Sequence, residues 1–235
     1  MKLLNNLSLI IPSKNDAVRI YENIEFIIKY LHENIDEFEI IIVSNGSSKE
    51  SVLKIDKLSS KYSFIRHCVL KESGKGIAVK EGLLKSKYNN ILFTDADCSV
   101  NILEFDNFVE NQELISGFVV GNRKNHNSKN LNSPLLRKIS GYLYLKLLIN
   151  LFNLDIEDTQ CGFKAINKLI FKDCVKFTTK GYSFDLELFL LARESNVKVR
   201  QIPVEYVHNS NSKILIFSDT LKMIRETFSI YSLKK

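Results

Sequence analysis

Hydrophobic residues along the chain form two kinds of pattern, and in the first part of the chain the two alternate. Short, nearly continuous apolar runs predict strands buried on both faces, whereas apolar residues three or four positions apart predict helices with one buried face. Strands are expected at residues 7–11, ending at Pro12, and at 38–43, 64–70 and 91–94. Helices are expected at residues 16–31, 49–61 and 74–84. Because strand and helix alternate, we expect a parallel sheet with right-handed crossovers.

The second part of the chain alternates less regularly and contains longer helices. Ser133-Pro134, a cap followed by proline, predicts a helix that runs to Phe152 and is apolar on most sides. The other expected elements are strands at 114–120 and 197–207, a short strand or turn at 160–166, a polar loop at 124–132, and helices at 184–193 and 214–231. We therefore expect a single α/β domain, residues 1–213, followed by a C-terminal amphipathic helix, residues 214–235.

The charge of the chain narrows the class of its partners. The net charge is +6, which suits anionic partners such as nucleotides and phospholipids. The basic residues are spread out and do not interleave with aromatic residues, so we expect no nucleic-acid partner. The four cysteines lack the spacing of zinc ligands, and reduced, buried thiols are expected instead.

The N-terminal sequence and the apolar helices indicate where in the cell the protein is found. The N-terminus lacks the apolar core of a signal peptide, and no apolar run approaches the ~20 residues that cross a bilayer. A cytoplasmic protein is therefore expected. The helices at 133–152 and 214–231 are candidates for peripheral contact with a membrane, with Lys222 and Arg225 facing lipid phosphates. Packing against the sheet, or against a second copy in a homodimer, fits their pattern equally well.

Two acids one residue apart, Asp95 and Asp97, follow the apolar run at 91–94. Placing a carboxylate at the end of a core strand costs free energy unless a nearby cation compensates its charge. Mg²⁺ and Mn²⁺ prefer oxygen ligands and often bind one or two carboxylates plus substrate phosphates. Turns at 13–16 and 44–48 are expected at the same sheet edge, where folds of this class bind ligands. The pattern indicates a metal held against a diphosphate; for the two acids alone, a solvated turn is the alternative.

Motifs that follow one another along nearly the whole chain resemble those of family 2 glycosyltransferases. Within that family the resemblance is greatest to the dolichyl-phosphate glucosyltransferase and polyprenyl-phosphate sugar synthase branch. The motifs are Ile-Ile-Pro-Ser-Lys-Asn-Asp (10–16), Asn-Gly-Ser-Ser (45–48), Gly-Lys-Gly-Ile-Ala-Val (74–79), Thr-Asp-Ala-Asp (94–97), Val-Gly-Asn-Arg (120–123), Asp-Thr-Gln-Cys-Gly-Phe-Lys (158–164), Phe-Asp-Leu-Glu (184–187) and Ser-Lys-Ile (212–214). The resemblance implies a GT-A fold, an open mixed sheet with helices on both sides. It also implies transfer of a sugar from a nucleotide diphosphate, with inversion, using Mg²⁺ or Mn²⁺.

The resemblance assigns donor-side residues. Asp95 and Asp97 match the Asp-x-Asp metal motif, and His208 is either a third metal ligand or a plain loop residue. Lys75 matches a loop near the nucleotide, where its flanking glycines allow close backbone approach. The remaining nucleotide-sugar contacts it implies are Pro12, Ser13, Asp16, Ser44, Asn45, Ala96 and Lys213. Asp16 is equally suited to capping the helix that follows it.

One departure from the family pattern concerns the nucleotide base. Two adjacent aspartates usually stand where this chain has Ser44 and Asn45. An Asn carboxamide can pair with uracil, because its oxygen accepts a hydrogen bond and its amide nitrogen donates one. The oxygen and the nitrogen can exchange places, so the same side chain could also pair with cytosine. A UDP-sugar is the expected donor, with other nucleotides left open.

The acceptor side is also assigned by resemblance. Arg123 and Arg137 correspond to two arginines that hold the acceptor phosphate, and a guanidinium fork suits phosphate well. Asp158 is the first choice for the residue at the reaction centre, and Asp185 and Glu187 are rivals of which at most one faces the site. A hydroxyl acceptor would need such a general base, whereas a phosphate acceptor would not.

The expected function is therefore transfer of a hexose from a UDP-sugar to a polyprenyl phosphate at the cytosolic membrane face. A saccharide hydroxyl, as in capsule or lipopolysaccharide synthesis, is the alternative acceptor. An inactive nucleotide-sugar-binding protein is a third reading, suggested by Ser44-Asn45. Spacing alone does not identify the sugar.

Overall fold

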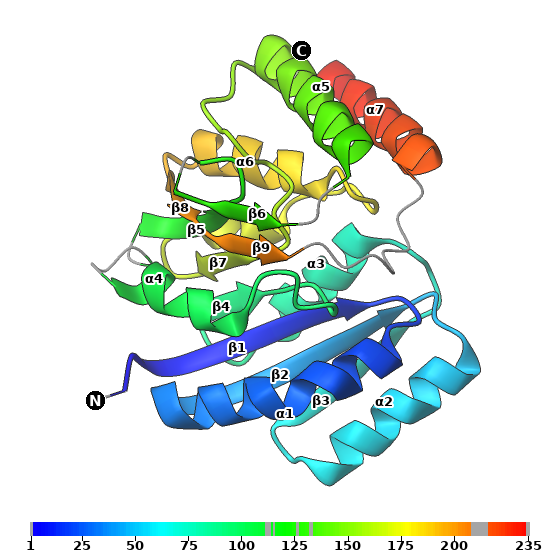
Figure 1. The fold of residues 1–235 in the computed structure, drawn as a ribbon, viewed down its shortest axis with the longest axis vertical. Coiled ribbons are helices and arrows are strands. Elements are labelled where there is room, and N and C mark those ends of the chain that lie inside the picture. The colour runs from blue at the N-terminus through cyan, green and yellow to red at the C-terminus, as the bar shows by residue number, and fades with distance from the viewer. Residues whose placement is uncertain are drawn as a thin grey trace.

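The computed structural model describes residues 2–110, 114, 116–125, 127–131, 134–207 and 216–233. Its strands form a seven-stranded sheet, in the order β3-β2-β1-β4-β7-β5-β8, and a two-stranded sheet, β6-β9, within this described part (Figure 1). The strands are β1 (Leu4–Ser13), β2 (Ile35–Asn45), β3 (Ile65–Leu70), β4 (Asn90–Phe93), β5 (Gly117–Asn122), β6 (Lys129–Leu131), β7 (Lys164–Asn167), β8 (Lys198–Pro203) and β9 (Glu205–Val207).

The large sheet is mixed, as the family resemblance implies, and not wholly parallel. Strands β3, β2, β1 and β4 are parallel neighbours, which confirms the alternation predicted from the first part of the chain. β7 runs antiparallel between β4 and β5, and β8 then pairs in parallel with β5. The prediction of a parallel sheet concerned the first part of the chain and holds there; the short apolar run of β7 does not reveal strand direction.

Helices cover both faces of the sheet. They are α1 (Ala17–Asn34), α2 (Lys49–Lys61), α3 (Lys75–Lys85), α4 (Phe105–Val109), α5 (Leu135–Phe152), α6 (Phe184–Glu194) and α7 (Ile216–Leu233), with short 3₁₀ helices η1 (Ile102–Glu104) and η3 (Lys172–Val175). Side chains of α1, α2 and α4 form one apolar cluster with one sheet face, and side chains of α3 and α6 form another with the opposite face. Neighbouring residues of β1 divide between them: Leu9 joins the first cluster and Ile10 the second. This alternation explains why the strand reads as a continuous apolar run.

Four predicted ranges differ from the structure. Pro12 does not end β1, which continues to Ser13 in register with β2. Thr94 N donates to Ile10 O, so Ile10 faces β4. Pro12 is two residues further along β1, so its nitrogen faces β4 too. The pairing of β1 with β4 ends at Ile10 and Phe93, before Pro12 is reached. The proline therefore removes no ladder hydrogen bond.

The other three corrections lie in the second part of the chain. The strand expected at 197–207 is two strands, β8 and β9, which belong to different sheets. The polar loop expected at 124–132 contains β6, a three-residue strand that pairs in parallel with β9. The strand expected at 114–120 lies instead at Gly117–Asn122.

α5 and α7 lie side by side at one end of the molecule (Figure 1). Their inward residues, among them Leu148 of α5 and Ile230 of α7, belong to the same cluster as α6. Their outward residues include exposed apolar side chains: Leu135, Ile139, Tyr142, Leu143 and Ile149 on α5, and Leu221, Phe228 and Leu233 on α7. Within the described residues, no helix is both long and apolar enough to cross a membrane.

Candidate functional site

The loops that follow β1 and β2 are joined at the carboxyl edge of the sheet. Asn15, which has a positive φ of 59°, accepts a hydrogen bond from Ser48 N at 2.7 Å through Oδ1. Its own backbone N–H donates to Ser47 Oγ at 3.1 Å. The predicted donor-side turns at 13–16 and 44–48 therefore do converge.

Asn45 connects three elements through its side chain. Nδ2 donates to Ser13 O at 2.9 Å, and Oδ1 accepts from Gly74 N at 3.0 Å, just before α3. These contacts fix which end of the carboxamide is which, so the two ends no longer exchange freely. Base reading by Asn45 stays a prediction, and it would have to use the remaining donor and acceptor positions.

The other predicted residues of these loops have defined surroundings. Ser44 is fully buried, and its Oγ lies 2.8 Å from Nε2 of His67, whose Nδ1 lies 2.7 Å from Asp56. Asp16 stands at the start of α1, but its carboxylate accepts from Lys14 N and Arg19 Nη1 rather than from the helix amides. Its role as a side-chain cap is therefore wrong.

Asp95 and Asp97 lie directly after β4, at the same edge. Asp95 Oδ1 lies 2.5 Å from Lys75 Nζ, and its side chain remains 40% exposed. Asp97 accepts from Ser99 N at 3.1 Å through Oδ1. Between the two acids and Ser99, Cys98 adopts a positive φ of 48°, which makes the turn tight. Burial alone would raise the pKa of Asp95, but Lys75, Lys164 and Arg123 together hold it below its usual value.

The donor set at this turn fits a hard divalent cation. Two carboxylates project from one turn, and both retain exposure to solvent. Mg²⁺ and Mn²⁺ accept one or two carboxylates when substrate phosphates supply further oxygens. Across the described residues no cluster of three or more His, Cys, Asp or Glu could hold a metal, so among these residues the donors at this turn are the two carboxylates.

Two glycines allow close contacts here, one beside this turn and one at the start of α3. A Cβ at Gly162 would lie 1.9 Å from Asp95 Oδ2, so only glycine leaves room for the carboxylate. Gly76 N donates to Lys180 O and Gly181 O, and a Cβ at Gly76 would lie 2.3 Å from Thr179 O. The close approach expected near Lys75 is therefore made by the protein's own backbone, which fixes the start of α3.

Arg123 and Asp158 were assigned to different tasks, yet they bind each other. Arg123 Nε and Nη2 donate to the two oxygens of Asp158 at 2.7 and 2.9 Å, and Arg123 N donates at 3.0 Å. Burial alone would raise the pKa of Asp158, but this guanidinium holds it well below its usual range. A carboxylate so strongly stabilised as the anion is a poor general base.

Asp185 has a different electrostatic environment. It is buried, and its Oδ1 lies 2.8 Å from Lys164 Nζ. Burial raises the pKa of Asp185, although Lys164 and Lys75 oppose the rise. Glu187, two residues on, accepts instead from Thr178 and Thr179. The two acids therefore have different partners, and which of them faces the site stays a prediction.

Sequence reasoning gave no role to Tyr182 or Lys164. Burial raises the pKa of the Tyr182 phenol, Lys75 lowers it, and Asp219, Asp95 and Asp16 raise it further. Tyr182 therefore lies within electrostatic reach of the donor-side acids and of Asp219 in α7. The sequence feature that points to Tyr182 is the motif at 184–187, which begins two residues after it.

Several predicted residues lie outside the described part or are described only in the backbone. His208 and Lys213 fall within residues 208–215, which the structure does not describe. Arg137 is in the first turn of α5, where only its backbone is described. Pro12 and Ala96 are buried at the carboxyl ends of β1 and β4. Ser13 is also buried, and within the described residues its Oγ has no hydrogen-bond partner.

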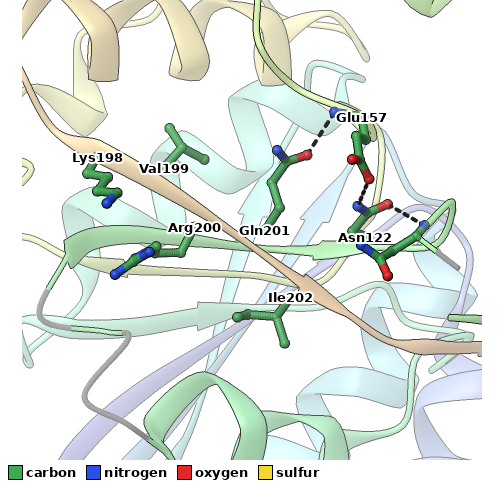
Figure 2. Close-up of a pocket in the computed structure, with 8 residues that line it drawn as sticks. Asn122, Glu157, Lys198, Val199, Arg200, Gln201 and Ile202 are labelled. Atoms are coloured by element: carbon green, nitrogen blue, oxygen red, sulfur yellow. Dashed lines mark hydrogen bonds between the residues drawn. The ribbon is translucent and has the colours of Figure 1, made fainter. Parts of the chain in front are cut away.

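A hollow of about 300 Å³ lies elsewhere, beside β8 (Figure 2). Figure 2 shows Gln201 accepting from Glu157 N at 2.8 Å and Asn122 donating to Glu157 Oε2 at 2.6 Å. These bonds hold the segment that precedes Asp158. The lining contains none of the predicted donor-side residues; it comprises Asn122, Asn125, Glu157, Lys198, Val199, Arg200, Gln201 and Ile202.

Comparison with known proteins agrees with this architecture. The structure resembles mannosyl-3-phosphoglycerate synthase from Rubrobacter xylanophilus, with a TM-score of 0.71 and 13% identity over 98% of this chain and 75% of that one. It also resembles glucosyl-3-phosphoglycerate synthase from Mycobacterium tuberculosis in complex with Mn²⁺, UDP-glucose and phosphoglyceric acid. That match has a TM-score of 0.68 and 14% identity over 97% of this chain and 80% of that one. The fold is that of a GT-A glycosyltransferase.

Sequence comparison identifies the family. The model for glycosyl transferase family 2 matches residues 8–175. A dolichyl-phosphate beta-glucosyltransferase from Dictyostelium discoideum is 31% identical over 246 residues, which covers 95% of this chain and 73% of that protein. The dolichyl-phosphate beta-glucosyltransferase of Saccharomyces cerevisiae is 28% identical over 241 residues, covering 94% and 72%. The chain belongs to glycosyl transferase family 2, and it is a glycosyltransferase.

Proposed function

We propose that the protein transfers a hexose from a UDP-sugar to a polyprenyl phosphate, with inversion, using Mg²⁺ or Mn²⁺. The observation that carries the donor half is the grouping of Asp95, Asp97 and Lys75 at one sheet edge. The acceptor half is supported by the relatives named dolichyl-phosphate beta-glucosyltransferase, which match along nearly the whole chain. Glucose is accordingly the first sugar to test.

Each donor-side residue has a task in this proposal. Asp95 and Asp97 would hold the cation, which when bound supplies Lewis-acid neutralisation of charge on the leaving diphosphate. Ser13 and the turn around Asn45 lie where the nucleoside would enter, and the buried Ser13 Oγ is a candidate to hydrogen-bond it. His208 and Lys213 remain candidates for closing the site over the diphosphate.

On the acceptor side, Arg123 and Arg137 would hold the lipid phosphate. Arg123 Nε and Nη2 are engaged with Asp158, so it is Nη1 that would face the acceptor. Asp158 then acts as a positioning residue, because it fixes the plane and direction of the guanidinium. An ionised phosphate acceptor needs no general base, which fits the strongly stabilised Asp158 carboxylate.

The lipid tail calls for an apolar surface near the site. α5 and α7 offer exposed apolar side chains, and exposed Lys138, Lys146 and Lys222 lie on the same two helices. Lysine beside apolar residues suits the boundary between headgroups and acyl chains of an anionic membrane. The charges of both Asp219, near the start of α7, and Asp95 of the donor site raise the pKa of Tyr182, which supports a position of the start of α7 near the donor site. We propose peripheral contact with the cytosolic face of a membrane through α5 and α7.

A saccharide hydroxyl is the second candidate acceptor, and Asp185 is the observation that favours it. Its pKa is raised by burial, in the direction of an effective general base. With this acceptor Asp185 would remove the hydroxyl proton as the sugar is transferred. Asp185→Asn then abolishes transfer, whereas transfer to a lipid phosphate tolerates the change better.

Product analysis distinguishes the two acceptors. The protein is incubated with UDP-glucose, Mn²⁺ and either dolichyl phosphate in vesicles or a panel of free glycans, and products are identified by mass spectrometry. Glucosyl phosphoryl dolichol is expected, with its formation reduced about a hundredfold or more in Asp97→Ala. Asp155→Ala changes an exposed acid and serves as the matched control. Transfer to glycans alone would overturn the lipid acceptor.

The arginine assignment has its own comparison. Arg137→Ala is expected to weaken use of the lipid phosphate, while Lys57→Ala, at an exposed lysine of α2, leaves it nearly unchanged. Equal activity in the two variants would contradict the role of Arg137.

A further inference from the structure

Lys75 is directed to Asp95 by backbone contacts on both of its sides. Gly74 N donates to Asn45 Oδ1, and Gly76 N donates to Lys180 O at 2.9 Å and to Gly181 O at 3.1 Å. α3 begins at Lys75, so the residue has little freedom in its main chain. Its ammonium lies 2.5 Å from Asp95 Oδ1, with 18% of the side chain exposed.

Both members of this pair are charged. Lysine and aspartate side chains both carry their charges at neutral pH, and the 2.5 Å between Lys75 Nζ and Asp95 Oδ1 is an ion-pair distance. Asp95 is therefore neutralised by a cation of the protein itself before any ligand binds.

A divalent cation approaching Asp95 in this state meets a positive charge already in contact with the carboxylate. Repulsion between these like charges opposes binding of the divalent cation. A nucleoside diphosphate removes this repulsion, because its oxygens can accept hydrogen bonds from the Lys75 ammonium and also coordinate the cation.

We propose that Lys75 forms an ion pair with Asp95 in the ligand-free enzyme and exchanges this partner for the diphosphate when the nucleotide binds. The divalent cation then binds with the nucleotide and not before it. The inference rests on the proposed function, because it takes the donor to be a nucleoside diphosphate sugar. It adds that metal binding is conditional on the nucleotide and that Lys75 imposes the condition. The free enzyme would then hold little metal at cellular concentrations.

The test measures Mn²⁺ binding with and without UDP, from the electron paramagnetic resonance signal of free Mn²⁺. In the wild type, UDP is expected to tighten Mn²⁺ binding at least about tenfold, a coupling of ~1.4 kcal/mol. Lys75→Met keeps the length of the side chain and removes its charge. In this variant Mn²⁺ without UDP should bind about tenfold more tightly than in the wild type, and the effect of UDP should shrink.

Two further variants show that the charge at this position is responsible. Lys75→Arg retains the cation and should behave as the wild type does. Lys85→Met removes a lysine from the last turn of the same helix, far from Asp95, and should also leave Mn²⁺ binding unchanged. Circular dichroism checks that each variant is folded.

Either of two results overturns the proposal. One is a folded Lys75→Met protein that binds Mn²⁺ alone no more tightly than the wild type. The other needs only the wild type: equal Mn²⁺ affinity with and without UDP, when UDP itself binds, means that Lys75 imposes no condition. If UDP and other nucleoside diphosphates fail to bind at all, with or without Mn²⁺, the donor assignment fails instead.

Discussion

Three carboxylates near the carboxyl edge each contact one cation: Asp95 contacts Lys75, Asp158 contacts Arg123, and Asp185 contacts Lys164. Removing one partner of a buried pair leaves an uncompensated charge, which costs about 3–5 kcal/mol. Arg123→Met should therefore lower the free energy of unfolding by about 3 kcal/mol, measured by urea denaturation. Lys57→Met, at an exposed lysine of α2, should change it little.

The double change Arg123→Met with Asp158→Leu completes this experiment. Because it removes both charges, it should recover part of the lost stability. A double variant that is less stable than Arg123→Met would show that Asp158 contributes through its other bonds, such as the one from Gln160 N. The pair also means that loss of activity in an Arg123 variant is informative only when folding is measured alongside.

The Asp158 carboxyl should also give the protein an acid-sensitive stability. Its pKa is lower in the folded protein than the usual value of about 3.9, so its contribution is complete above that value and is lost as the pH falls below it. The melting temperature should drop between about pH 4 and pH 3, and this drop should be smaller in Asp158→Asn. The raised pKa of Asp185 acts in the opposite sense, since its protonation favours the folded state. An unchanged drop in Asp158→Asn would assign the acid sensitivity to other groups.

The pairing of these residues could not be predicted from the sequence. The family resemblance singled out Arg123, Asp158 and Asp185 and gave each a separate task. Arg123 and Asp158 are 35 residues apart and meet only because β5 ends beside the segment that precedes β7. Spacing shows which residue types are present at an edge, but not which of them neutralise one another.

At the scale of elements, α3 illustrates how tightly one helix must fit. A Cβ at Gly76 would lie 2.3 Å from Thr179 O and 2.9 Å from Phe184 Cβ. Gly76→Ala should destabilise the protein by about 1–3 kcal/mol and weaken UDP binding, because Lys75 would shift with the helix. Gly141→Ala is the matched control: no atom lies within 4 Å of its Cβ, and in the interior of α5 it should stabilise by roughly 0.5–1 kcal/mol.

Thermal denaturation and UDP titration measure both effects. If Gly76→Ala were as stable as Gly141→Ala and bound UDP normally, the segment at 179–181 would have to move freely. That outcome would remove the reason for placing Lys75 by backbone contacts.

Elements were predictable where a periodic pattern was long. The helices α1, α2 and α6 and the strands β1 to β4 lie close to the expected ranges, because each has enough apolar residues to define a period. β6 was missed and β9 was merged with β8 into one strand, because three residues define no period; the two short strands exist through pairing with each other. The direction of β7 depends on the path of the chain before it, which no local pattern records.

At the scale of the whole molecule, the exposed apolar side chains of α5 and α7 form a surface whose contact with water is unfavourable in free energy. Contiguous apolar patches of this kind mark interaction sites. We expect a lipid surface to cover it, because Lys138, Lys146 and Lys222 lie exposed on the same helices. Ile139→Ser combined with Leu143→Ser should lower co-sedimentation with phosphatidylserine-containing vesicles about tenfold or more, since each buried Leu or Ile contributes about 1.5–3 kcal/mol.

The control for this last prediction uses apolar residues that are equally exposed elsewhere. Leu53→Ser combined with Leu84→Ser alters α2 and α3, away from the α5–α7 pair, and should leave vesicle binding unchanged. Sedimentation velocity without vesicles distinguishes the other candidate cover, a second copy of the chain. If the wild type is a dimer and the α5 variant a monomer, with vesicle binding equal in both, the surface is a subunit interface and the lipid must reach Arg137 by another route.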